Sequence, residues 1–242
     1  MSTKATDLTL LKMCRAEYVR LARYVQRWGI SPAGVEQSIR EFTEIRDGRA
    51  WVRPIAYAPT GVGLGCPLPD RHISRLFWQI SRITESQLKC WATPSTPTFA
   101  FVPPESYHIT VVNRSHYEVS DVFPMTSDEF SQVRAAVAQL DLGSISILTC
   151  GLVLTSSGKL FVKCLPVDDR ILALRRYLVS EIPFLRANMP RMIHIKLGHI
   201  LVPLEKAQTR ELIAWLQRLD QQVIGRLAFT DLYTPVGRIG IQ

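Results

Sequence analysis

The segment "RMIHIKLGHILVPL", residues 191–204, places two histidines in an apolar run. Its β-branched and aliphatic residues, with Pro190 before them and Pro203 near the end, predict a strand over about 192–202. Alternation of side chains puts Met192, His194, Lys196 and Gly198 on one face and Ile193, Ile195, Leu197 and His199 on the other. His194 and Lys196 are therefore expected to lie together, and His199 to pack with the core.

A metal site is not expected in this segment. Residues five apart point to opposite faces of a strand, and on a helix they lie about 140° apart, so His194 and His199 cannot share one ion. The run contains no carboxylate and no HExxH spacing. We expect no metal and no other cofactor.

A second segment, "PESYHITVVN" at residues 104–113, matches the pattern of "PRMIHIKLGH" at residues 190–199. Each has a proline four residues before a histidine, then an isoleucine, then a hydrogen-bonding residue. On two strands, His108 and Thr110 would form one pair on a face, and His194 and Lys196 another.

The surrounding chain repeats the order strand, helix, strand, helix, strand, which indicates an internal duplication. The Pro-containing segment after residue 48 marks a boundary near residue 58, so we expect a helical extension over 1–58 and a domain over 59–242, with lobes of roughly 59–153 and 154–242. The expected helices are 7–28, 31–47, 70–91, 126–140, 167–182 and 204–224. The expected strands are 61–68, 107–113, a pair turning at Ser157-Gly158, 192–202, and a final hairpin turning near 235–237.

Composition limits the class of protein. At 242 residues and 47% hydrophobic content the chain can bury a large core, and it has no apolar run long enough to span a bilayer. The net charge of +8 favours anionic partners such as nucleotides or RNA, although the basic residues are scattered. Five cysteines without CxxC spacing indicate free thiols, including Cys150 and Cys164, and a cytoplasmic location.

A His-x-Thr/Ser motif that occurs twice, about eighty to ninety residues apart, resembles the signature of the 2H phosphoesterase superfamily, which includes RNA 2′,3′-cyclic phosphodiesterases, also called 2′-5′ RNA ligases. The segments "GVGLGCPLPDRHISRLFWQI" (61–80) and "FVPPESYHIT" (101–110) also look like that family, and the resemblance covers residue 60 to the end. It implies an α+β fold, duplicated and bilobal, with antiparallel sheets flanking a central cleft. Other duplicated α+β domains are the alternative.

The resemblance also implies a site. His108 and His194 would be the acid and base, and Thr110 would donate to a phosphate oxygen; Lys196 stands where the family has Thr or Ser, and we expect it to bind phosphate. Arg114 and Tyr233 are candidates for the border of the cleft. The expected activity is metal-independent hydrolysis of a cyclic phosphate or 2′-5′ phosphodiester in a nucleotide or RNA. A binding-only relative is the alternative, and an interaction module or self-association through the N-terminal helices is a third.

Overall fold

The computed structural model describes residues 4–47, 49–53, 61–64, 71–113, 125–185, 192–234 and 238–241, and the side chains from residue 11 onward within them, apart from Arg238. Its helices are α1 (Lys4–Trp28), α2 (Pro32–Phe42), α3 (Arg71–Lys89), α4 (Ser127–Val137), α5 (Arg170–Glu181) and α6 (Lys206–Leu219). Short 3-10 helices are η1 (Pro104–Ser106), η2 (Pro183–Leu185) and η3 (Asp220–Val223).

The strands are β1 (Thr43–Arg46), β2 (Arg49–Val52), β3 (Gly61–Leu64), β4 (Phe99–Phe101), β5 (Ile109–Asn113), β6 (Ile145–Leu154), β7 (Lys159–Pro166), β8 (Ile193–Ile200), β9 (Gly225–Phe229), β10 (Asp231–Tyr233) and β11 (Arg238–Gly240). β1 and β2 form a separate hairpin. The others form one antiparallel sheet in the order β11-β10-β3-β5-β8-β7-β6-β9, with β4 paired to β8. This confirms the α+β class.

The sheet is continuous, whereas we expected separate sheets on the two sides of a cleft. β5 and β8, the strands that carry the two motifs, meet in the middle at the pair Ile109 and Ile195. β6 lies beside β7 and β9, and the C-terminal strands β10 and β11 extend the edge beyond β3. Strands from both ends of the chain therefore mix within the sheet. The division at residue 58 and the lobe boundary near 153 stay predictions.

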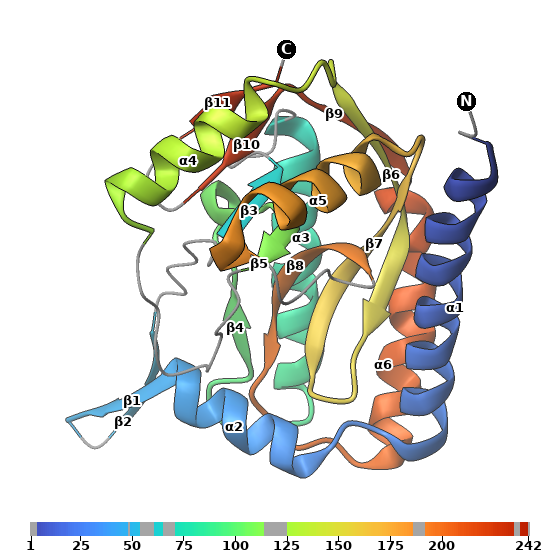
Figure 1. The fold of residues 1–242 in the computed structure, drawn as a ribbon. Helices are drawn as coiled ribbons and strands as arrows, with labels where there is room; N and C mark the ends of the chain where they lie inside the picture. The colour runs from blue at the N-terminus through green and yellow to red at the C-terminus, as the bar shows by residue number, and fades with distance from the viewer. Residues whose placement is uncertain are drawn as a thin grey trace.

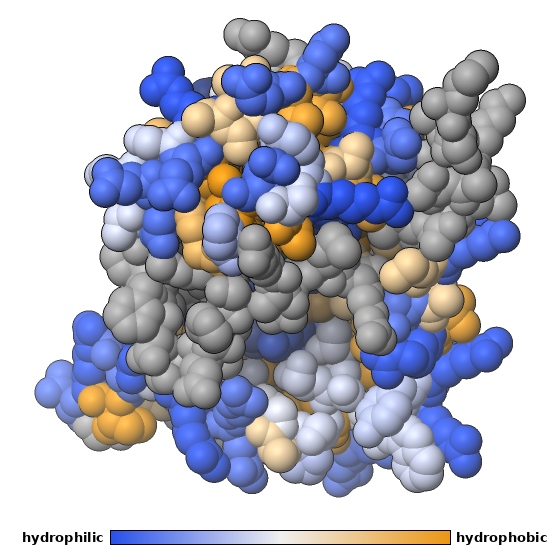
Figure 2. Space-filling model, viewed as in Figure 1, coloured by the Kyte–Doolittle hydropathy of each residue, from blue (hydrophilic) through white to orange (hydrophobic). Residues whose placement is uncertain are grey.

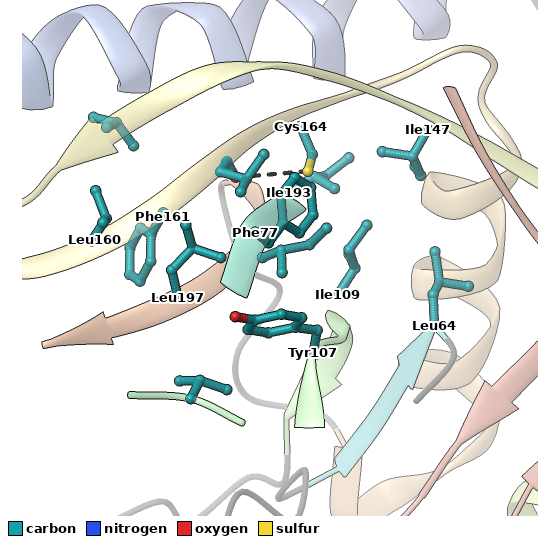
Figure 3. Packing of buried hydrophobic residues seen from close by; sticks show 14 of the residues in the cluster. Leu64, Phe77, Tyr107, Ile109, Ile147, Leu160, Phe161, Cys164, Ile193 and Leu197 are labelled. Carbon is teal, nitrogen blue, oxygen red and sulfur yellow. Dashed lines mark hydrogen bonds between the residues drawn. The ribbon is translucent and has the colours of Figure 1, made fainter. Parts of the chain in front are cut away.

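The back of the central strands packs against α3. Tyr107, Ile109, Ile193, Ile195 and Leu197 are fully buried, as the alternation predicted. Figure 3 shows Tyr107, Ile109, Ile193 and Leu197 close to Phe77 of α3, and the Phe77 and Tyr107 rings meet edge to face with centroids 6.0 Å apart. This packing leaves the other face of β5 and β8 for the motif residues.

The N-terminal helices pack onto the same sheet. The hydroxyl of Tyr18 on α1 accepts from the backbone N–H of Cys164 at 3.0 Å and donates to the carbonyl of Ile193, so it joins β7 and β8. Figure 1 shows α1 beside β7, α5 above the central strands and α2 below them. These three helices frame the region where β5 and β8 meet.

One predicted helix ends earlier than expected. We expected a helix over 31–47, but α2 ends at Phe42 and residues 43–52 form the β1–β2 hairpin. β-branched Thr43 and Ile45 favour a strand, and Asp47, which has a φ of 51°, precedes Gly48 in the Asp-Gly pair typical of tight hairpins. Figure 2 shows an apolar spot on this hairpin at the lower left, where Ile45 is 71% exposed.

Most other predicted elements are present with shifted ends. Thr126 and Glu129 form a capping box at the start of α4, with backbone-to-side-chain distances of 2.9 and 3.2 Å. β6 and β7 are joined at the predicted turn, and Cys150 and Cys164 are free thiols. β4 was not predicted, because its three residues lie between prolines 97 and 103. Asp70, where the expected helix 70–91 begins, and the turn 235–237 lie outside the described residues.

Candidate active site

The pairing of β5 with β8 brings the two motifs together. Because Ile109 is opposite Ile195 in an antiparallel pair, His108 is opposite Lys196 and Thr110 is opposite His194. All four side chains are half-buried, while the residues between them are fully buried on the other face. The four residues thus occupy the corners of a quadrilateral on one face of the sheet, with the histidines at opposite corners.

The His108 ring has a defined tautomer. Its Nδ1 lies 2.8 Å from the carbonyl oxygen of Ser106, which can only accept, so Nδ1 carries the proton. In the neutral ring Nε2 then has the lone pair. Burial lowers the pKa of His108, the bond to Ser106 opposes this shift, and the charge of Lys196 adds to it. His108 is therefore a neutral base at neutral pH.

His194 is more enclosed than His108. Its ring stacks on Phe161 of β7, with centroids 4.1 Å apart and planes 28° apart, and its Nδ1 is buried without a hydrogen-bond partner among the described residues. Burial, followed by the charges of Lys196, His108 and Arg175, lowers the pKa of His194 to about 3. The ring is consequently neutral near pH 7. It remains partly exposed, so it is not sealed in the core.

Lys196 lies among other charged groups. Burial and the neighbouring charge of Lys159 lower its pKa to about 7, and Glu41 of α2 opposes the shift. A lysine in such a place exchanges its proton near neutral pH, unlike an exposed lysine. Lys196, which stands where a His-x-Thr/Ser motif would have a hydroxyl, therefore has a pKa close to neutral pH.

Arg175 of α5 binds the backbone of β5 at Thr110. Its guanidinium is buried, and it donates to the carbonyl oxygens of Val111 at 2.9 Å and Thr110 at 3.1 Å. It lies near Cys14 and Tyr18, and burial lowers its pKa to about 10, so it stays charged at neutral pH. No sequence pattern indicated this role, because Arg175 is one basic residue among many on a helix.

His199 lies on a different face from the one predicted. Leu160 is opposite Gly198, but Phe161 is opposite Lys196, so Leu197 is an extra residue in β8. Such a bulge reverses the alternation, and His199 points toward α2. The centroid of its ring lies 4.4 Å from that of the Phe42 ring, and its Nδ1 lies 3.2 Å from the hydroxyl oxygen of Ser38. It is 1% exposed, which confirms that it is buried.

Of the border candidates, Tyr233 is placed on the site's face. Tyr233 of β10 is opposite Gly63 of β3, and Gly63 is opposite Thr110, so the three share a face. A Cβ on Gly63 would lie 3.3 Å from Cδ2 of His108, so the glycine leaves room for that imidazole. Arg114, the other candidate, lies outside the described residues.

Two further observations concern ligands. Among the described residues there is no group of three or more histidine, cysteine, aspartate or glutamate side chains placed to hold a metal ion. No helix in the described ranges is long and apolar enough to cross a membrane.

Comparison with known proteins gives a limited result. No family model and no curated protein matches the sequence. Solved structures of Kluyveromyces marxianus Usb1, alone and with uridine monophosphate, are similar at 10% identity and TM-scores of 0.45 and 0.44, covering 75% of this chain and 96% and 98% of theirs. The protein TT0787 of Thermus thermophilus is similar at 10% identity and a TM-score of 0.43, over 74% of this chain and 91% of its own.

Proposed function

We propose that this protein is a 2H-type phosphoesterase that hydrolyses a cyclic phosphate or a 2′-5′ phosphodiester of a nucleotide or RNA without a metal ion. The observation that carries the proposal is the quadrilateral of His108, Thr110, His194 and Lys196 on adjacent strands. Two histidines at opposite corners can act on opposite sides of one phosphorus, as an in-line displacement requires.

Each residue of the site has a proposed role that follows from its chemistry. Nε2 of His108 takes a proton from the attacking water, because Nδ1 is occupied by the Ser106 carbonyl. The Thr110 hydroxyl donates to a non-bridging phosphate oxygen, where negative charge must be held in the transition state. His194 and Lys196 on β8 supply the remaining hydrogen bonds and the second proton transfer.

Tyr233 is the proposed contact for the base. It shares the face of the site and is separated from Thr110 by Gly63, a residue without a side chain. A nucleobase can stack on a partly exposed tyrosine ring, which adds roughly 1–3 kcal/mol per base. RNA or a nucleotide as partner also agrees with the net charge of +8.

The test is turnover of uridine 2′,3′-cyclic phosphate and of 2′-5′-linked oligonucleotides by the purified protein in EDTA. We expect turnover by the wild type and its loss in His108→Ala. The matched control is His72→Ala, which changes an exposed residue of α3. Absence of turnover of every substrate in the wild type contradicts the proposal.

The second candidate is a nucleotide- or RNA-binding protein without turnover. The burial of His194 favours it, since a ring with a pKa of about 3 is a poor proton donor near neutral pH. Calorimetric titration with the same cyclic nucleotide separates the two. Binding without conversion supports this second function, and conversion rules it out.

A further inference from the structure

The identity of the proton donor follows from the differences between the two strands. An in-line cleavage needs one group to accept a proton from water and another to give one to the leaving oxygen. His108 has a free lone pair on Nε2 and suits the first task. The candidate donors on β8, the strand that pairs with β5, are His194 and Lys196.

His194 is poorly arranged to carry a positive charge. One face of its ring is covered by Phe161, and Nδ1 is buried with no partner among the described side chains and backbone groups. An imidazolium needs both N–H groups solvated or paired, so protonation here leaves a buried donor unsatisfied. His194 is suited to act as a neutral hydrogen-bonding ring.

Lys196 has the position and the reach. It stands directly opposite His108, and its flexible four-carbon stem can bring Nζ over the centre of the quadrilateral, where the phosphate would lie. The charged and titratable groups around it are Lys159 on β7, Glu41 on α2, His108 on β5, and His194 and His199 on β8. Its pKa of about 7, set by burial and by Lys159, matches a donor that works near neutral pH.

We propose that Lys196 is the general acid of the reaction, with His108 as the base and His194 as a neutral hydrogen-bonding partner of the phosphate. This inference rests on the proposed function. The water oxygen bonds to phosphorus while His108 Nε2 takes its proton. The bond from phosphorus to the departing ribose oxygen breaks, and Nζ of Lys196 gives that oxygen a proton. The neutral amine and the imidazolium then exchange protons with solvent, so the net reaction consumes one water and yields a phosphomonoester.

The decisive test varies the leaving group. A ribose alkoxide needs a proton as it departs, whereas the nitrophenolate of thymidine 5′-(p-nitrophenyl phosphate) does not. We expect Lys196→Met to lower kcat/KM for uridine 2′,3′-cyclic phosphate by about 10²–10⁴-fold, and to lower it much less for the nitrophenyl ester. Lys196→Arg, which keeps the charge but gives up no proton, should show the same selective loss.

A second measurement follows the pH dependence. An acid must be protonated, so kcat/KM for the cyclic substrate should fall above the pKa of Lys196, and this alkaline limb should vanish in Lys196→Met. Lys159→Met removes a like charge beside Lys196 and should move the limb to higher pH, because it raises the pKa of Lys196. A limb that stays in place in Lys159→Met contradicts the assignment.

The outcomes separate this inference from the function on which it rests. If Lys196→Met lowers turnover of both substrates equally, the lysine only holds the phosphate and the inference is overturned. If His194→Gln instead shows the selective loss, bound phosphate has made His194 the acid, and the inference is again overturned. Both results leave a working phosphoesterase. Only a wild type that converts neither substrate overturns the proposed function as well.

Discussion

The imidazole ring of His194 lies stacked on the phenyl ring of Phe161, 4.1 Å away, on neighbouring strands of the central sheet. Burial, followed by the charges of Lys196 and His108, keeps the ring neutral in the folded protein. An unfolded histidine has a pKa near 6.5, whereas the folded pKa of His194 is about 3. The difference has a consequence for stability that can be measured.

We expect the free energy of unfolding to decrease as the pH falls from about 6.5 toward 3. In that window the unfolded chain binds a proton at residue 194 and the folded chain does not, so acid favours unfolding. His199, with a folded pKa of about 2, acts in the same direction. Each histidine adds a slope of up to about 1.4 kcal/mol per pH unit.

Urea unfolding of the wild type and of His194→Gln across this pH range checks the prediction. The variant should show a shallower dependence of stability on pH, because one of the histidines whose pKa is lowered by folding has been removed. His72→Gln, at an exposed position, is the matched control and should keep the wild-type slope. Parallel curves for the wild type and His194→Gln would contradict the prediction.

Thr110→Val tests the phosphate donor. Valine has nearly the same shape but no hydroxyl, so one hydrogen bond to the transition state is lost while the strand is kept. We expect kcat to fall by about 10²–10³-fold. Turnover of the cyclic nucleotide and thermal unfolding of the same sample should be measured together. An unchanged kcat in a folded variant excludes Thr110 as a donor.

Arg175→Met tests the support behind Thr110. The change leaves the carbonyls of Thr110 and Val111 without the guanidinium that now donates to both. We expect a loss of roughly 1–3 kcal/mol for each buried carbonyl left unsatisfied. Arg176→Met, at the exposed neighbouring position, should change the stability by less than about 0.5 kcal/mol in urea unfolding. Equal midpoints for the two variants would rule out this role.

Gly198→Ala tests the close approach of β4 to β8. A Cβ at residue 198 would lie 2.3 Å from the carbonyl oxygen of Ala100 and 2.4 Å from the ring of Phe99, so the strands must separate. We expect a destabilisation of about 1–3 kcal/mol. Gly240→Ala is the control, because its nearest neighbour would be 4.0 Å away. If Gly198→Ala is as stable as the wild type in urea unfolding, β4 can move away from β8 at little cost, and the prediction is contradicted.

The sequence was enough to predict which residues of the two motif strands share a face; their role as a site stays a prediction. Two matched strands with period-two alternation place His108, Thr110, His194 and Lys196 correctly, because the pattern depends only on local backbone geometry. The face of His199 was predicted wrongly, since one extra residue in β8 reverses the alternation. Gly198 beside it is the kind of residue that marks a bulge inside a strand, but an ideal alternation was assumed. Phe161 and Arg175 were missed for another reason. Their roles depend on contacts made by distant segments, which composition and spacing do not reveal.

The contact of Tyr18 with the sheet bears on the order of folding. Its partner Ile193 lies 175 residues further along the chain, so this bond closes only after synthesis has passed residue 193. During translation α1 is synthesised before β7 and β8, so its apolar side has no partner strands until both have been made. A helix that is made before β7 and β8 is thus fixed in place only after these two strands have formed.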